Sequence, residues 1–231
     1  MTGQETRTKK RELILDAAEA LFSRHGYDGV TLRAIAKMAD VDVALANYYF
    51  GPKRDLFEAV FMRRAKVLNS WRLEALEAVI EEAQPNAPSV RCIIEAYFAP
   101  LLTRSHVHDE GWKNYYALIG YVNSSHEWGG QLMSQQFDPL IDRFLEALKM
   151  AIPDVSEENL YWAYHCLSGA LTLALAQTGR IDHLSNGLCR SDDLSGAHSH
   201  IVNFITAGFE QLKDMPEKKK TATPGDAAAP V

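Results

Sequence analysis

Residues 31–56 read TLRAIAKMADVDVALANYYFGPKRDL, and this stretch decides the fold of the N-terminal part of the chain. Its hydrophobic spacing predicts two short helices, 32–38 and 43–50, separated by the four-residue break 39–42. A longer amphipathic helix over 9–25 precedes them. Three helices whose last two are joined by a tight turn are typical of a helix-turn-helix unit.

Residues with strong helix-end preferences stand at the boundaries of these helices. Thr31 and Asp42 precede the two short helices, where a side-chain oxygen can accept a hydrogen bond from a free backbone N–H group. Gly26 ends the first helix and Gly51 the third, because glycine readily adopts positive φ. Pro52 suits the first turn of the next helix.

The two short helices can share a small core and still leave side chains free. The expected core residues are Ile35, Ala36, Val41 and Leu45, and the expected outward residues are Val43, Ala44 and Asn47. Short outward side chains would let the second helix lie deep in the major groove, where apolar groups contact thymine methyls and an amide contacts a base or phosphate. The phosphate-contacting candidates are Thr31, Arg33, Tyr48, Tyr49 and Lys53. The start of the helix at Lys53 adds free N–H groups as an anion site.

Composition and charge exclude several classes of protein. The chain has 231 residues, a formal net charge of −6 and 47% hydrophobic residues, as is ordinary for a soluble globular protein. Residues 1–66 carry a net charge of +3 and residues 67–231 a net charge of −9, which fits an anion-binding end on an acidic body. Apolar runs stay well short of the ~20 residues that span a bilayer, and no signal peptide is visible. The three cysteines predict free thiols in a reducing cytoplasm.

The rest of the chain also has helical periodicity, so the predicted class is all-α. A long helix over 53–80 is followed by predicted helices at 89–104, 110–124, 127–151, 156–179 and 195–213. Pro139 should kink or split the third of these five, and 181–193 should be a polar loop. The predicted domains are a disordered tail 1–8, a helix-turn-helix domain 9–52, a larger helical domain 53–214 and a disordered tail 215–231.

Three patterns in the N-terminal part occur together. They are LF-x-x-x-G-Y at 21–27, T-x-x-x-I-A-x-x-A-x-V at 31–41 and Y-F-x-x-K-x-x-L at 49–56. Over roughly residues 10–60 the chain therefore resembles the tetracycline-repressor-like (TetR/AcrR) family of bacterial transcriptional regulators. It departs from the family at Asp40, in place of the turn glycine, at Asp42, in place of a capping serine, and at Asn47, in place of an aromatic residue. The string 46–50 (ANYYF) is similar to a subgroup that includes fatty-acid-responsive repressors.

The resemblance implies that residues after about 67 form a domain for ligand binding and dimerisation. An aromatic-rich middle region suits an apolar pocket with a few polar anchors, although each aromatic could instead belong to the core. The pocket candidates are Trp71, Phe98, Leu102, Tyr115, Tyr116, Ile119, Asn123, Phe137 and His165, with His126 as a further anchor.

The last two long helices suggest a homodimer. Segment 156–179 is apolar almost all round and segment 195–213 has an apolar stripe, so that each could serve both the core and a partner subunit. The interface candidates are Leu167, Ala170, Leu171, Ala174, Ile201, Ile205 and Phe209. The alternative is that both helices only fill the subunit core.

The remaining histidine, aspartate and cysteine side chains of interest indicate neither a metal site nor a reactive thiol. His106, His108 and Asp109 indicate a hydrated loop rather than a metal site, because further ligands at metal-binding spacing are missing. Cys166, beside His165 on an apolar helix, indicates a buried and inert thiol. No catalytic motif is recognisable, so we expect neither enzymatic activity nor a metal or cofactor.

The sequence thus predicts a cytoplasmic, homodimeric repressor that binds a double-stranded, palindromic DNA operator. A hydrophobic or amphipathic small molecule, such as a fatty acid, an acyl-CoA or an aromatic compound, would release it. One alternative is a protein-interaction module whose heads no longer bind specific DNA and whose Asp40/Asp42 surface contacts another protein. Another is a small-molecule enzyme built in the helical domain.

Overall fold

The computed structural model describes residues 3–101, 110–125 and 129–215, and every regular element within them is helical. The all-α prediction is confirmed for these residues. The α-helices are α1 (Gly3–His25), α2 (Leu32–Met38), α3 (Val43–Phe50), α4 (Lys53–Ala83), α5 (Val90–Ala99), α6 (Glu110–Ser124), α7 (Gly129–Ala151), α8 (Glu157–Ala176), α9 (Arg180–Leu184) and α10 (Leu194–Gln211).

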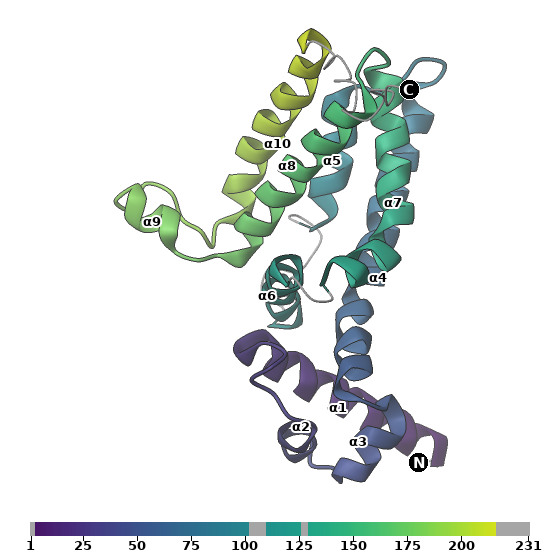
Figure 1. Ribbon diagram of the computed structural model, residues 1–231, viewed down its shortest axis with the longest axis vertical. Helices are drawn as coiled ribbons and strands as arrows, with labels where there is room; N and C mark the ends of the chain where they lie inside the picture. The colour runs from purple at the N-terminus through teal and green to yellow at the C-terminus, as the bar shows by residue number, and fades with distance from the viewer. Residues whose placement is uncertain (1–2, 102–109, 126–128, 216–231) are drawn as a thin grey trace, which may run out of the picture.

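The molecule has a small head and a larger helical body (Figure 1). Helices α1, α2 and α3 form the head at one end, and α4 runs from the head into the body. Helix α6 lies at the junction, where it packs against α1 and α4 as well as against α7 and α8. The body is completed by α5 and α10, which pack together, and by α8 beside α10.

The predicted helix ends of the head are confirmed in atomic detail. The Thr31 hydroxyl accepts a hydrogen bond from the Ala34 N–H at 3.2 Å, and the Asp42 carboxylate accepts one from the Ala44 N–H at 2.7 Å. Asp40 takes the left-handed conformation, with φ of 52°, at the place of the family's turn glycine. The tight turn therefore forms without glycine.

The first helix begins earlier than its apolar stripe indicates. It starts at Gly3, so the prediction of an unstructured tail over 1–8 is wrong for residues 3–8. Those residues are polar, and a polar helical turn has no hydrophobic period to detect. Residues 1–2 and most of the predicted C-terminal tail, 216–231, lie outside the described residues.

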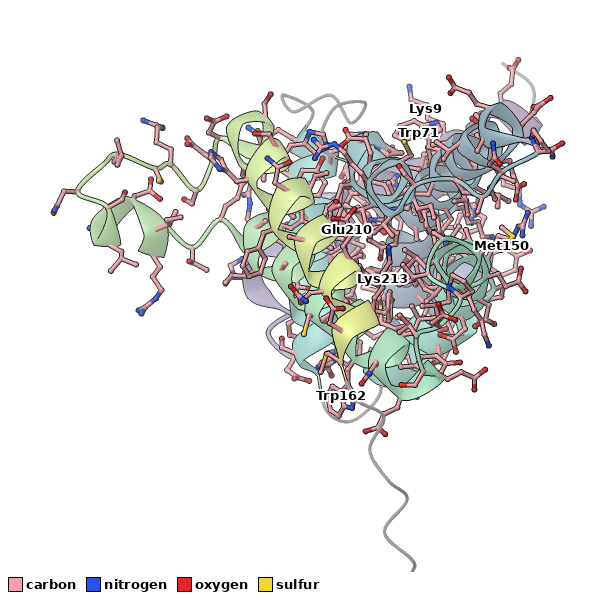
Figure 2. The ribbon with its side chains drawn as sticks, turned by 90° about the horizontal axis from the view of Figure 1, so that it is seen from above. Lys9, Trp71, Met150, Trp162, Glu210 and Lys213 are labelled. Atoms are coloured by element: carbon pink, nitrogen blue, oxygen red, sulfur yellow. The ribbon has the colours of Figure 1, made fainter. Side chains whose placement is uncertain are left out.

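Three predictions about the body differ in part from the structure. Helix α7 continues through Pro139 as one element, which excludes the split but not the kink that was the other predicted outcome. The predicted helix 156–179 ends at Ala176, because Gln177 adopts a left-handed conformation with φ of 44°. The expected loop 181–193 contains the short helix α9, which projects from the body in Figures 1 and 2.

A buried ion cluster joins the head to the body. Glu19 of α1 is 3% exposed and binds both Arg63 and Arg64 of α4, with Arg64 Nη2 at 3.1 Å from its Oε1. Gly111 of α6 lies against this cluster, and a Cβ added there would overlap the Arg64 guanidinium. The absence of a side chain at this glycine lets α6 approach α1 and α4 closely.

In the part of the chain that the structure describes, no helix is both long and apolar enough to cross a bilayer.

Candidate DNA-binding surface and ligand cavities

The face of α3 that is predicted to contact DNA bases, which we call the reading face, is exposed to solvent. Val43 is 38% exposed, and Ala44 and Asn47 are exposed as well, whereas Ala46 and Phe50 on the other side of the helix are buried. The eight residues of α3, about two helical turns, thus have a core side and an outer side. The outer side carries only small side chains and one amide near the start of α3, which suits close approach to base edges.

Tyr48 is 69% exposed beside this face, and its hydroxyl accepts a hydrogen bond of 2.8 Å from Arg7 of α1. The Arg7 guanidinium also lies 5.6 Å from the centre of the Tyr48 ring. Sequence reasoning missed Arg7, because it assigned residues 1–8 to a tail. The basic run at residues 7–11 (RTKKR) was the signal that could have revealed it.

Lys53 has a structural role that its sequence position did not reveal. Its ammonium donates hydrogen bonds to the backbone carbonyls of Tyr27 at 2.9 Å and Val30 at 3.0 Å, and it lies 4.1 Å from the centre of the Tyr27 ring. Two of its three N–H donors are therefore used to hold the loop between α1 and α2. The phosphate contact stays a prediction, and the structure adds this structural role to it.

The remaining phosphate-contacting candidates divide by exposure. Thr31 and Arg33 are exposed at the start of α2, where they can reach a DNA backbone. Tyr49 is half-buried and packs its ring against Tyr48 and Phe50, with ring centres 5.5 and 6.4 Å away. Tyr49 therefore contributes to packing of α3 as well as to its surface.

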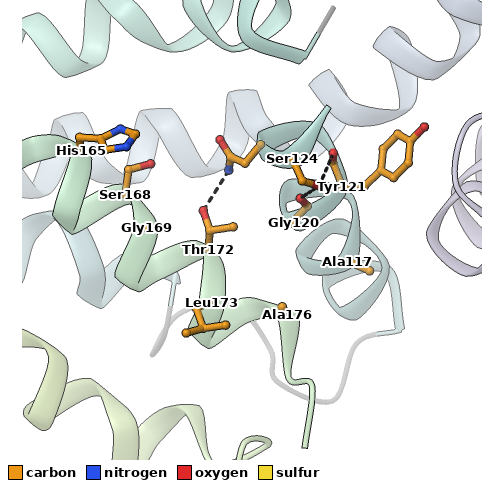
Figure 3. Close-up of a pocket in the computed structure, with 11 residues that line it drawn as sticks. Ala117, Gly120, Tyr121, Ser124, His165, Ser168, Gly169, Thr172, Leu173 and Ala176 are labelled. Carbon is orange, nitrogen blue, oxygen red and sulfur yellow. Dashed lines mark hydrogen bonds between the residues drawn. The ribbon is translucent and has the colours of Figure 1, made fainter. Parts of the chain in front are cut away.

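An open groove of about 560 Å³ lies between α6 and α8. Its walls include Gly120, Tyr121 and Asn123 from α6 and His165, Thr172 and Leu173 from α8 (Figure 3). This volume is within the range of small-molecule sites. Two predicted pocket residues, Asn123 and His165, thus line the groove.

A second and much smaller cavity, of about 30 Å³, lies deeper in the body. We call it the inner cavity. Four predicted pocket residues line it, namely Tyr115, Ile119, Asn123 and Phe137. Arg72 of α4 also lines it and was not predicted, although its spacing of four residues from buried Leu68 and Leu76 placed it on the inward face of α4.

Three other predicted pocket residues line neither cavity, because they pack in the core. Phe98 and Tyr116 are buried, and Tyr116 donates its hydroxyl to the Leu101 carbonyl at 3.2 Å. Trp71 stacks on Trp112 with ring centres 5.4 Å apart. Leu102 and His126 lie outside the described residues.

The reactive side chains form no recognisable metal centre. Among the described residues, no group of three or more His, Cys, Asp or Glu side chains could hold a metal ion. His106, His108 and Asp109 lie outside that part of the chain. Cys166 is exposed, so the prediction of a buried thiol is wrong; it lies on the outer face of α8.

Two family profiles match the chain in the order of its two structural parts. "Bacterial regulatory proteins, tetR family" matches residues 14–60, and "Tetracyclin repressor-like, C-terminal domain" matches residues 95–208. Together they cover more than two thirds of the chain. The chain belongs to the TetR family. This membership places it among regulatory proteins rather than enzymes.

Curated helix-turn-helix regulators are similar to part of the chain. The regulator BetI of Paraburkholderia phymatum is 29% identical over 92 residues, which are 40% of this chain and 45% of BetI. The repressor KstR of Mycolicibacterium smegmatis is 39% identical over 61 residues, 26% of this chain and 30% of KstR. The alignments thus span less than half the length of these relatives.

Solved structures match nearly the whole chain in fold. HlyIIR, a hemolysin II transcriptional regulator, has a TM-score of 0.56 and 21% identity over 87% of this chain and 98% of that one. FadR, a fatty acid degradation regulator from Bacillus halodurans, has a TM-score of 0.60 and 15% identity over 86% of this chain and 95% of that one. At these identities the likeness establishes the TetR fold alone.

Most of the residues predicted for the dimer interface are buried inside the subunit and do not lie on its surface. Leu167, Leu171, Ile205 and Phe209 are buried inside the subunit, so they have no surface left for a partner and the prediction is wrong for these four. Ala170, Ala174 and Ile201 are half-buried. The outward apolar side chains are instead Trp162 and Leu173 of α8, 60% and 66% exposed, and Phe204 of α10, 78% exposed. Figure 2 shows Trp162 at the edge of the body.

Proposed function

We propose that this protein is a ligand-responsive repressor that binds a palindromic DNA operator as a homodimer in the cytoplasm. The observation that carries the proposal is the free face of α3, where Val43, Ala44 and Asn47 are exposed on a helix whose other side is buried. In helix-turn-helix proteins the corresponding helix lies in the major groove, and its first turns contact base edges.

The surroundings of α3 support the DNA-binding part. Arg7, held against Tyr48 by its 2.8 Å hydrogen bond, puts a cation beside the reading face. Exposed Thr31 and Arg33 lie at the start of α2. Such groups bind phosphates and so fix the register of a protein on the duplex without reading sequence.

Helix α6 supports the response to a ligand, because it contacts both the head and the groove. Asn114 of α6 accepts a hydrogen bond of 2.9 Å from the Ser23 hydroxyl of α1, and Tyr121 lies against Gly26. About two turns beyond Asn114, Gly120, Tyr121 and Asn123 line the groove. A molecule in the groove that favours a different position of α6 would change the orientation of the head. It can do so only by binding one state more tightly than the other.

The outward faces of α8 and α10 support the dimer. Trp162 and Leu173 lie eleven residues apart, three helical turns along one face of α8, and Phe204 is the most exposed aromatic residue of α10. Pairing these helices with their symmetry mates would bury apolar surface and give a four-helix interface. Two heads could then reach successive major grooves about one helical turn apart.

The effector we propose is a hydrophobic or amphipathic small molecule. A fatty acid, an acyl-CoA or an aromatic compound would each suit a groove of about 560 Å³ lined mainly by apolar atoms. One structural neighbour is a regulator of fatty acid degradation, and the string 46–50 resembles fatty-acid-responsive members of the family.

Selection from randomised duplexes, followed by mobility shift, tests the proposal. We expect enrichment of a palindrome whose half-sites lie about one turn apart, and loss of preference for it in Asn47→Ala. Arg33→Ala should weaken binding to all sequences and reduce the slope of log K against log salt by about 1. The control is Lys213→Ala, which removes a positive charge at the end of the body distant from the head. It should change neither the sequence preference nor the salt dependence of DNA binding.

The selection also separates the proposal from its main alternative. If no palindrome is enriched and Asn47→Ala binds duplexes like the unaltered protein, sequence-specific regulation is refuted. A protein-interaction module would then account better for the exposed face of the head.

A further inference from the structure

Arg72 is a charged side chain enclosed in the body. It lies on α4 between buried Leu68 and Leu76 and is itself 2% exposed. Arginine is rarely buried without a partner, because removing the guanidinium from water is unfavourable unless an opposite charge or several acceptors replace the lost hydration.

The partners of Arg72 do not balance its charge. Its Nε donates to the Tyr97 carbonyl at 2.9 Å, and its guanidinium lies 4.0 Å from the centre of the Tyr97 ring. Its Nη2 is buried and has no hydrogen-bond acceptor among the described residues. Within the same residues it forms no ion pair with any carboxylate. One strong donor therefore stays unused.

Tyr115, which also lines the inner cavity, carries a second polar group without a hydrogen-bond partner in the described part of the chain. This group is its hydroxyl, and the side chain is 1% exposed. Burial raises the pKa of Tyr115 and of Tyr164, another residue lining the cavity, so both phenols stay neutral at physiological pH. The residues lining this cavity then carry one positive charge, from Arg72, and no negative charge.

The inner cavity adjoins the groove. Asn123, Ser168 and Thr172 line both, so that the two spaces share a wall between α6 and α8. Asn123 donates a hydrogen bond of 3.1 Å to the Thr172 hydroxyl across this wall, drawn as a dashed line in Figure 3. This neutral hydrogen bond therefore lies in the wall between a molecule in the groove and the inner cavity.

We propose that the effector is an organic carboxylate whose charged group enters the inner cavity to bind Arg72 Nη2 and the Tyr115 hydroxyl, while its apolar remainder occupies the groove. This inference rests on the proposed function, because it names the chemical class of the effector. A guanidinium N–H and a phenol are both donors, and a carboxylate is the acceptor that forms charge-assisted hydrogen bonds with them.

The size of the inner cavity favours a carboxylate over a phosphate. A volume of about 30 Å³ suits a group as small as a water molecule or a carboxylate, but a phosphate adds two further oxygens and a second charge with only one cation to meet it. A neutral alcohol would fit the space but would leave the Arg72 charge uncompensated. A thioester offers only an uncharged carbonyl oxygen.

Isothermal titration calorimetry with matched acids and alcohols tests the inference. The probes are decanoate with decan-1-ol and 4-phenylbutanoate with 4-phenylbutan-1-ol, each titrated into the full-length protein at pH 7.4. For at least one pair we expect the acid to bind ten times or more tightly than its alcohol. In Arg72→Met this preference should fall to less than twofold, and Tyr115→Phe should weaken acid binding severalfold with little effect on the alcohol.

Three measurements distinguish recognition from a fault in folding. Arg143→Met removes an exposed cation from α7 and should leave the acid preference unchanged. Arg72→Lys keeps the charge and should retain part of the preference. In the absence of ligand, the melting temperature of Arg72→Met should not fall below that of the unaltered protein, because methionine fills the site without an uncompensated charge.

The inference is overturned if the unaltered protein binds no acid of the series more tightly than its alcohol, or if folded Arg72→Met keeps the preference. A mobility shift with the selected operator is run in parallel. Release of DNA by the alcohols as readily as by the acids would refute the carboxylate but leave the repressor intact. Failure to bind any operator would refute the repressor without affecting the calorimetric result.

Discussion

Two cationic side chains of the head make contacts within the protein that differ from those expected of them. Lys53 falls on a family motif and was predicted to bind phosphate, yet its ammonium holds the carbonyls of Tyr27 and Val30. Arg7 was assigned to a tail, yet it contacts Tyr48. Local sequence gives the type of a side chain and its face on a helix. It does not give the hydrogen-bond acceptor of a long lysine or arginine side chain, because that acceptor depends on which segments pack beside it.

Lys53→Met should destabilise the head. It removes two hydrogen bonds from a charged donor, so we expect the free energy of unfolding to fall by about 1–3 kcal/mol in urea titrations. The control is Arg54→Met, which removes the neighbouring cation and its exposed pair with Glu58 and should cost about 0.5 kcal/mol or less. Unchanged stability of Lys53→Met with reduced DNA affinity would favour the phosphate contact over the structural role.

Gly111→Ala should destabilise the junction between head and body. The added methyl group would overlap the Arg64 guanidinium beside Glu19, so we expect a loss of about 1–3 kcal/mol of unfolding free energy. Gly120→Ala, on the same helix, meets only the Ala176 methyl at 4.0 Å and should be neutral or stabilising by up to about 1 kcal/mol. Equal effects of the two substitutions would show that α6 does not depend on this close approach.

At the scale of helices, α4, α6 and α7 determine how the body is connected to the head. Helix α4 belongs to both parts, and α6 contacts the head through Gly111 and Asn114. Helix α7 is held against α4 by a two-pronged ion pair, in which Arg143 Nε and Nη2 lie 2.7 and 3.0 Å from the two oxygens of Glu77. Each long helix was recognisable from its period, but none of these cross-helix contacts could be read from the sequence.

The pair of Glu77 and Arg143 should give a small dependence of stability on pH. The hydrogen bonds from Arg143 lower the pKa of Glu77 below its usual 4.5, so the folded state favours the ionised form. The resulting stability is present at neutral pH, starts to decline as the pH falls past about 4.5 and is lost below the folded pKa. Both side chains are at least one third exposed, so solvent screening limits the effect to about 0.5 kcal/mol.

Denaturant titrations of Glu77→Gln from pH 7 to pH 3 measure this effect. The unaltered protein should be the more stable at pH 7, and the difference should vanish at pH 3. Glu74→Gln removes an exposed carboxylate from the same helix and should match the unaltered protein throughout. A difference between Glu77→Gln and the unaltered protein that grows toward acid pH would contradict the assignment.

At the scale of the whole molecule, the outward faces of α8 and α10 expose large apolar side chains to solvent. The sequence predicted a dimer through the apolar stripes of these helices, but the strongest stripe residues, such as Leu171 and Phe209, fill the subunit core. The exposed residues Trp162, Leu173 and Phe204 remain for a partner. An all-round apolar helix cannot reveal which of its faces meets the core, because both faces have the same composition.

Phe204→Glu should therefore prevent the proposed dimer from forming. A carboxylate at the centre of an apolar interface would be desolvated without a partner, so we expect monomers in analytical ultracentrifugation and operator affinity reduced at least tenfold. Leu188→Glu changes an even more exposed apolar residue, in the segment between α9 and α10, and should remain dimeric. Dimers of Phe204→Glu with normal affinity would exclude this face as the interface.

The all-helical class, the helix-turn-helix with its caps, and the outward placement of Val43, Ala44 and Asn47 were all predictable from the chain of amino acids. These features depend on period, turn chemistry and residues close in the chain, such as Thr31 with Ala34. Three further features became known from the folded protein: Phe98 and Tyr116 belong to the core, Arg72 is enclosed with an unused donor, and certain faces of α8 and α10 stay exposed. Those features depend on packing between helices distant in sequence, because the sequence of one helix does not specify which other helices pack against each of its faces.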